Sequence, residues 1–327
     1  MPGPSASLAA TALTGLLASA PALTGYCAGL DNFPNRPIRL IVPWPPGGGA
    51  DGTSRILQQR MSENLGQQVV IDNRGGAGGN IGAAMGALTP PDGYTMIFAY
   101  SGTHAFNPTL YRDPGFKNSD FAPVTLTALV SNVLVVHPQV PVHSVKELLA
   151  YAKTNRVNYA SSGSGSANHL MGELFKTMAG IPMTHIPYKG GGPATAAIVG
   201  GEVQASFADP LASVPQIKAG RLRALGVSGA TRAPGLPDIP PIAELGVPGY
   251  DATSWNGMLV PAKTPRPVID RLNKAVLAAL NAPEVRERFL SQAYEPVGST
   301  PEYFGKFIES ETIKWGKVIK ESGAKVD

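Results

Sequence analysis

Hydrophobic and polar positions along this chain follow two alternating patterns. Short apolar runs predict buried strands, and most are followed by a segment whose apolar residues recur at helical spacing. The first pair is the apolar run 38–42 and a segment with one helical face formed by Ile56, Leu57, Met61 and Leu65. This alternation is typical of βαβ units, and it predicts parallel sheets covered by helices.

The alternation continues through most of the chain. Further strands are expected at 69–72, 94–100, 157–160, 184–187, 203–207 and 222–227, with helices between them. The apolar run 124–136 predicts one long strand that leaves the first unit, and 250–260 predicts an extended segment that returns to it. Three helices are expected at the end. The second has Pro283 in its first turn, and the third begins with a capping box of Ser299 and Glu302.

Two glycine-rich loops each connect an expected strand to an expected helix. The first follows residue 42 and contains Gly47, Gly48 and Gly49, whose backbone can approach a ligand closely. The second spans residues 161–169 and holds the equivalent place in the second unit. A helix N-terminus offers free N–H groups and the positive end of a dipole. The two loops therefore predict a cleft in which two helices face one anionic ligand.

Polar residues also follow the expected strand 94–100. Ser101, Thr103 and His104 stand at its carboxyl end, where open α/β sheets bind their ligands. These three residues are therefore candidate ligand contacts. The alternative is that they satisfy local backbone groups.

Composition narrows the class of protein. The chain has 327 residues, 43% hydrophobic and 15% charged, which leaves room for a large core and about two domains. The net charge of +4 comes without a basic run, so we expect no nucleic-acid partner. After the N-terminal segment, no apolar stretch reaches the 18 residues of a membrane-spanning helix.

The N-terminal segment predicts export. Residues 1–30 resemble a secretory signal peptide with an Ala20-Pro21-Ala22 cleavage site, although Lys and Arg are missing from its start. Cys27 is the single cysteine, and whether it is retained or lipidated stays open. One cysteine allows neither a disulfide framework nor a thiolate metal site.

The sequence patterns of common enzymes are missing. No G-x-S-x-G nucleophile elbow occurs, and the five histidines have no metal-ligand spacing. Few acidic residues lie near the expected cleft, which argues against paired catalytic carboxylates. We therefore expect a binding protein with no cofactor and no metal, and a hydrolytic enzyme is the weaker alternative.

The ordered series VPWPPGGGAD, NRGGAGGNIGA, YASSGSGSANHL, PYKGGGPA, SFADP, IKAGRLRALGVS and KWGKV resembles the Bug family of extracytoplasmic solute receptors. These are similar in role to the receptor component of tripartite tricarboxylate transporters. The resemblance implies an α/β, two-lobed type II periplasmic-binding-protein fold with two doubly wound sheets joined by hinge strands. It places residues 31–132 and 254–327 in the first lobe and 133–253 in the second.

The resemblance also implies a site and partners. The ligand would be a small carboxylate, held by main-chain N–H groups and water in the periplasm. The ligand-binding residues would be Trp44, Gly48, Gly49, Ala50, Asp51, Ser162, Gly165, Ser166, Ala167, Asn168 and Asp209. Trp44 could instead be a core aromatic, and Asp209 could be a helix N-cap that would otherwise accept hydrogen bonds from a ligand hydroxyl or ammonium.

The mechanism expected from this resemblance is hinge closure around the ligand. The closed monomer would then dock on membrane permease subunits of the transporter, and a signalling partner is the alternative. Ligand identity stays open among malate, citrate, an amino-acid dicarboxylate, an aromatic acid and an uncharged vitamin-like compound.

Overall fold

The computed structural model describes residues 1, 3 and 32–324. The expected signal peptide, Cys27 included, lies almost wholly outside the described residues. The chain divides into two units, residues 1–33 and 34–327, and the fold described below is that of the second unit.

The first sheet contains six strands in the order β11-β4-β10-β3-β1-β2. β1 pairs in parallel with β2 and β3, whereas β10 and β11 run antiparallel to their neighbours. The strands are β1 (Ile38–Val42), β2 (Val69–Asn73), β3 (Thr95–Tyr100), β4 (Phe121–Val130), β10 (Ser254–Pro261) and β11 (Tyr294–Pro296). β10 overlaps the segment 250–260 that was predicted to be extended, whereas β11 has no counterpart among the predicted strands.

The second sheet contains five strands in the order β7-β6-β8-β5-β9. β6 pairs in parallel with β7 and β8, and β5 runs antiparallel to β8 and β9. The strands are β5 (Val133–Val136), β6 (Asn158–Ser161), β7 (Thr184–Pro187), β8 (Ala205–Ala208) and β9 (Arg223–Val227). We call each sheet, with the helices that cover it, the first and the second lobe.

The prediction of one strand over 124–136 is wrong, because the run is two strands in different sheets. The break falls at Ser131 and Asn132, between β4 and β5. The Asn132 carbonyl accepts a hydrogen bond from Ser228 N, and its side-chain amide donates to Phe207 O at 2.9 Å. The chain is therefore tied to the second lobe where it crosses, a contact that an apolar pattern does not reveal.

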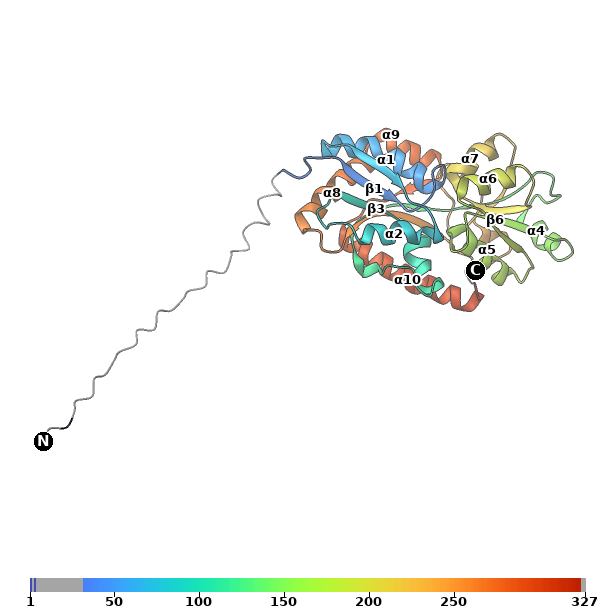
Figure 1. The fold of residues 1–327 in the computed structure, drawn as a ribbon. Coiled ribbons are helices and arrows are strands. Elements are labelled where there is room, and N and C mark those ends of the chain that lie inside the picture. The colour runs from blue at the N-terminus through green and yellow to red at the C-terminus, as the bar shows by residue number, and fades with distance from the viewer. Residues whose placement is uncertain (2, 4–31, 325–327) are drawn as a thin grey trace. The chain divides into compact units, whose positions relative to one another are not determined.

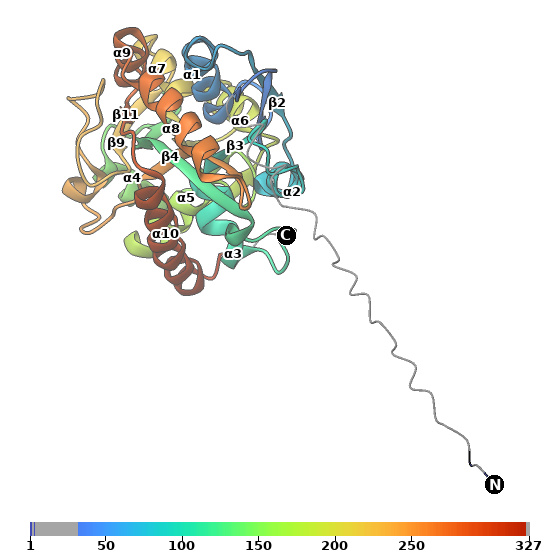
Figure 2. The same cartoon turned by 90° about the vertical axis from the view of Figure 1, so that its left-hand side faces the viewer.

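Helices cover both sheets (Figure 1). Those of the first lobe are α1 (Gly49–Leu65), α2 (Asn80–Ala87), α3 (Asn107–Leu110), α8 (Arg266–Leu280), α9 (Pro283–Ser291) and α10 (Pro301–Ser322). Those of the second lobe are α4 (Val145–Ala152), α5 (Ala167–Ala179), α6 (Gly191–Val199) and α7 (Pro210–Lys218). Figure 2 shows α8 and α10 lying along β4.

The expected apolar face of α1 is confirmed, since Ile56, Leu57, Met61 and Leu65 are all buried. The face of α2 is different, because Ile81 is exposed. A Cβ on Gly82 would overlap the Arg74 carbonyl and Pro43, and one on Gly86 would overlap Ile97. The glycine side of α2 therefore packs on the lobe, and the large apolar side chains of Ile81 and Leu88 are exposed.

The predicted capping box of α10 is wrong by one residue. Thr300 is the N-cap, and its hydroxyl accepts from Tyr303 N at 3.2 Å. The Ser299 hydroxyl instead accepts a hydrogen bond from Leu126 N in β4. The N-cap of α4 is Ser144, whose hydroxyl accepts a hydrogen bond from Glu147 N.

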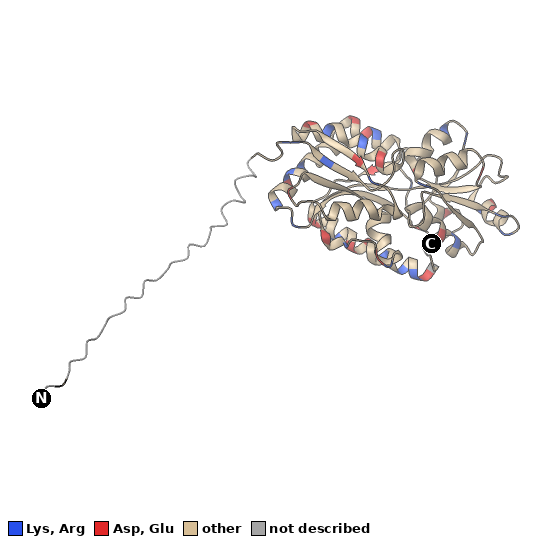
Figure 3. Cartoon of the chain, viewed as in Figure 1, with Lys and Arg blue, Asp and Glu red and all other residues tan. Residues whose placement is uncertain are grey.

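Charged residues of both signs lie along the outer helices, for example α1 and α10 (Figure 3). Within the part of the chain that the structure describes, no helix has the length and apolar character needed to cross a membrane.

Candidate functional site

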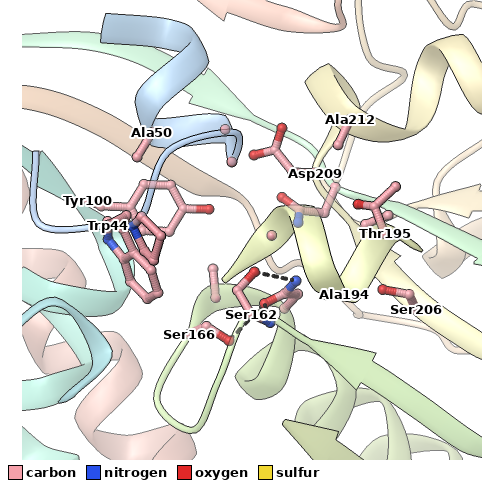
Figure 4. Close-up of a pocket in the computed structure, with 18 residues that line it drawn as sticks. Trp44, Ala50, Tyr100, Ser162, Ser166, Ala194, Thr195, Ser206, Asp209 and Ala212 are labelled. Atoms are coloured by element: carbon pink, nitrogen blue, oxygen red, sulfur yellow. Dashed lines mark hydrogen bonds between the residues drawn. The ribbon is translucent and has the colours of Figure 1, made fainter. Parts of the chain in front are cut away.

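A pocket lies between the two lobes, at the carboxyl ends of β1, β6 and β8. Residues of both sheets and of four helices contribute to its wall (Figure 4). They are Trp44, Pro45, Gly48, Gly49, Ala50, Tyr100, Asn132, Ser162, Ser166, Ala167, Asn168, Gly191, Ala194, Thr195, Ser206, Ala208, Asp209 and Ala212.

Most of the candidate residues from the sequence are brought together in this pocket. Those that line it are Trp44, Gly48, Gly49, Ala50, Ser162, Ser166, Ala167, Asn168 and Asp209. Those that lie outside the lining are Asp51, Ser101, Thr103, His104 and Gly165. The second group is close in sequence to the pocket but does not line it.

The first loop is held in shape by side chains behind it. Asn73 donates to the Trp44 carbonyl at 3.0 Å, and Gly47 N donates to Asp51 at 3.1 Å. Asp51 also accepts a hydrogen bond from Arg55. Burial raises the pKa of Asp51, but the hydrogen bonds from Arg55, Gly47 and Asn73 outweigh it and leave the pKa below its usual range. Asp51 therefore orders the loop as an anion.

The second loop is organised around Asn168. Its amide oxygen accepts from Ser162 N at 3.2 Å and from the Ser166 hydroxyl at 2.7 Å, and its amide nitrogen donates to the Ser162 hydroxyl. Behind the loop, Gly165 N donates to Nδ1 of His169, whose ring stacks on His185 at 3.9 Å. The loop is thus fixed before any ligand arrives.

Four helix N-termini meet at the pocket, those of α1, α5, α6 and α7. Among the described residues, no side chain forms a capping hydrogen bond at the start of α1, α5 or α6. Their first N–H groups have no partner within the helix, so they favour an anion. α7 differs, because Asp209 caps it by accepting from Leu211 N at 2.9 Å.

Asp209 also joins the lobes. It ends β8 in the second lobe, and both of its oxygens accept from the hydroxyl of Tyr294 in β11 of the first lobe, at 2.8 and 2.7 Å. Gly49 lies against this pair so closely that a Cβ there would overlap the carboxylate. Burial raises the pKa of Asp209 to about 6, although the Tyr294 and Leu211 hydrogen bonds lower it.

The aromatic side of the pocket is formed by Trp44 and Tyr100, whose rings meet edge to face at 5.9 Å. Figure 4 shows them across the pocket from Thr195 and Ser206. The indole N–H of Trp44 is buried and finds no acceptor within the described residues. Trp44 therefore offers an apolar ring to a ligand.

Three candidates after β3 are buried within the first lobe. The chain continues from β3 into a buried helical turn, Gly102–Phe106, in which the Thr103 hydroxyl donates to Gly78 O at 3.2 Å. His104 packs against Phe116 and Phe121, and burial lowers its pKa to about 4. Ser101 is also fully buried. These side chains support the wall of the first lobe.

Half of the lining was not predicted from the sequence: Pro45, Tyr100, Asn132, Gly191, Ala194, Thr195, Ser206, Ala208 and Ala212. Gly191 could have been found, because it belongs to the glycine run 190–192, which lies between an expected strand and an expected helix. Asn132 gave no such signal, since it lies inside an apolar run that reads as one strand.

The described residues offer few groups that could bind a metal ion or a cofactor. Within residues 32–324, no cluster of three or more His, Cys, Asp or Glu side chains could hold a metal ion. The groups that face the pocket are main-chain N–H groups, hydroxyls, two amides, two aromatic rings and one carboxylate. This set is suited to holding a polar ligand.

Comparison with known proteins agrees with this geometry. The sequence profile of the tripartite tricarboxylate transporter family receptor, TctC, matches residues 53–324. BugT of Bordetella pertussis is 37% identical over 300 residues, which cover 90% of this chain and 92% of BugT. Two solved structures, Rpa4515 of R. palustris with adipate and the periplasmic binding protein BugD, are 39% and 33% identical. Each match covers 90% of this chain and 100% of the other, with TM-scores of 0.87 and 0.86.

These similarities confirm the resemblance and the fold class. The structural neighbours are two-lobed binding proteins, as the two sheets and their connecting strands indicate for this chain. The chain therefore belongs to the TctC family of tripartite tricarboxylate transporter receptors, as a Bug-type periplasmic solute-binding protein.

Proposed function

We propose that this receptor captures a small carboxylate in the pocket between its lobes and delivers it to the permease subunits of a tripartite tricarboxylate transporter. The single observation that carries the proposal is the convergence of three helix N-termini without side-chain caps on one pocket, within the described residues. Rpa4515, whose structure contains adipate, supports the ligand class. Family membership supports the permease partner.

Capture works by hinge closure in this proposal. We place the lobe boundaries where the resemblance puts them, after residue 132 and before residue 254. The two crossings lie side by side, since Ser228 N donates to Asn132 O and Ala252 N donates to Ser228 O, each at 2.8 Å. A bend at these two short segments would move the lobes as rigid bodies, and ligand contacts from both lobes would favour the closed state.

The proposed ligand contacts are those of the candidate residues that line the pocket. The N–H groups at the starts of α1 and α5 hold the carboxylate, and Ser162, Ser166 and Asn168 hold it directly or through water. Asp51, Gly165, Ser101, Thr103 and His104 act indirectly, by shaping the loops and the wall. Among the alternatives, catalysis has less support, because no nucleophile and base are paired across the described part of the pocket.

A thermal-shift screen tests the proposal. We expect the refolded, ligand-free receptor to be stabilised by one or more mono-, di- or tricarboxylates and not by the matching amides. A ligand at 100 times its Kd adds about 2.7 kcal/mol to the free energy of unfolding, which raises the Tm by several degrees. Equal responses to acids and amides, or none, would contradict carboxylate capture.

Trp44 should report binding by fluorescence. Trp255 and Trp315 are fully buried and do not line the pocket, so a bound carboxylate should change mainly the emission of Trp44. Titration of the wild type should give a saturable change, which Trp44→Phe removes and Trp315→Phe retains. A ligand-dependent signal that survives in Trp44→Phe would mean that the ligand sits elsewhere.

A further inference from the structure

One carboxylate in the pocket has no cation to pair with. Asp209 accepts only from neutral donors, Leu211 N and the Tyr294 hydroxyl. Among the described residues, every ion pair involves other acids. The side chain lines the pocket and is partly exposed there. A group supplied by the ligand can therefore reach it.

The missing cation has an energetic consequence. Taking a charge out of water is costly unless a partner compensates it. Burial raises the pKa of Asp209 to about 6, so above pH 7 the carboxylate is mostly ionised and only partly compensated. A ligand ammonium would supply the compensation, and a hydroxyl would supply part of it. A second ligand carboxylate placed beside Asp209 would add electrostatic repulsion.

Nearby pocket residues add acceptors. The amide nitrogen of Asn132 is committed to Phe207 O, and its oxygen is buried with no partner within residues 32–324. The Ser206 hydroxyl donates to Ala160 O at 3.1 Å, which leaves its oxygen free to accept. Both residues line the same pocket as Asp209. This part of the wall is suited to a ligand that donates hydrogen bonds.

The uncapped start of α1, at Gly49, lies against Asp209, whereas a second group of donors lies apart from it. Figure 4 shows Ser162 and Ser166, in the loop before α5, on the side of the pocket opposite Asp209. The helix N-terminus there is not capped by a side chain of the described chain, so it is available to an anion. The side of the pocket at α5 therefore favours a negatively charged group, and the side at Asp209 favours a positively charged group or a hydrogen-bond donor.

From this asymmetry we infer that Asp209 determines specificity. The preferred ligand carries its carboxylate toward α5 and a hydrogen-bond donor, an ammonium group above all, toward Asp209. A dicarboxylate is disfavoured. The inference rests on the proposed function, because it assumes that a carboxylate enters this pocket. To the proposed function it adds the chemical group that the ligand carries at the end opposite its carboxylate.

Matched ligands test this inference. Calorimetry at pH 8 compares, at chain lengths of four, five and six carbons, the α,ω-diacid, the ω-amino acid, the ω-hydroxy acid and the plain monocarboxylate. We expect the amino or hydroxy acid to bind the wild type at least tenfold more tightly than the diacid of equal length. Tighter or equal binding of the diacid at every length would overturn the inference and leave carboxylate capture standing.

Asp209→Asn is the matched variant. The amide keeps the size of the side chain and an oxygen for Leu211 N and Tyr294, but it removes the charge. We expect the ratio of amino-acid to diacid affinity to fall at least tenfold in this variant. An unchanged ratio would show that Asp209 is a structural link between the lobes and does not select the ligand. Failure of every carboxylate to bind the wild type would overturn the proposed function as well.

Discussion

Gly49→Ala should weaken carboxylate binding by about 5- to 150-fold, which corresponds to the roughly 1–3 kcal/mol that overpacking costs. The added methyl group would overlap the Asp209 carboxylate and lie 2.7 Å from the Tyr294 hydroxyl oxygen. Asp209 cannot swing aside freely, because Leu211 N and Tyr294 hold it. The lobes would therefore have to stay further apart, and the ligand would lose contacts from one of them.

Gly192→Ala is the matched control. Gly192 also lies in the first turn of a helix at the contact between the lobes, but a Cβ there would meet only Gly47 O at 3.8 Å. We expect this variant to bind within about threefold of the wild type, while Gly49→Ala does not. Affinity should be measured by calorimetry, and circular dichroism should show that both variants are folded. Wild-type affinity in Gly49→Ala would mean that this close approach is not part of ligand capture.

Asp209→Asn should change the pH dependence of stability in the ligand-free receptor. The pKa of Asp209 is about 6 in the folded state and about 3.8 when unfolded. Because the folded pKa is the higher one, ionisation costs stability. This loss in the free energy of unfolding is absent below pH 4, grows between pH 4 and 6 and is complete above pH 6. A difference of about two pKa units between the folded and unfolded states corresponds to about 3 kcal/mol in the free energy of unfolding.

The measurement is the difference in Tm between Asp209→Asn and the wild type across pH 4 to 8. We expect this difference to shift in favour of the variant by several degrees as the pH rises through 4 to 6, and then to stay constant. Tyr294 and Tyr100 face Asp209, and burial raises the pKa of both phenols further above this range, so neither titrates within it. A flat difference would contradict the raised pKa.

Asp51→Asn is the control of opposite sign. The folded pKa of Asp51 lies below its usual value, so its ionised form stabilises the fold above the unfolded pKa, and this contribution is lost as the pH falls. Removing the charge should therefore cost stability at pH 7 and cost less at acid pH. Two aspartates beside two helix N-termini thus act in opposite directions, because one has an arginine partner and the other faces a pocket.

The sequence by itself determined the local elements and both glycine-rich loops. Apolar periodicity located β1, α1 and the strands β6 to β9, because the burial of one face leaves a direct trace in residue order. Glycine-rich loops before helices marked the walls of the pocket at Gly48, Gly49 and Ser166, because each loop stands between an apolar run and a helical pattern. The order of the motifs identified the family.

Only the tertiary structure determined which residues lie opposite the glycine-rich walls of the pocket. β11 places Tyr294 opposite Asp209, although 85 residues separate them in the chain. The break at Asn132 puts an amide into the pocket from within an apolar run. Ser101, Thr103 and His104 turn into the first lobe, because the chain after β3 coils into a buried turn. Sequence patterns record burial and local capping. The pairing of distant side chains across two lobes depends on how the sheets are placed, and residue order does not encode that locally.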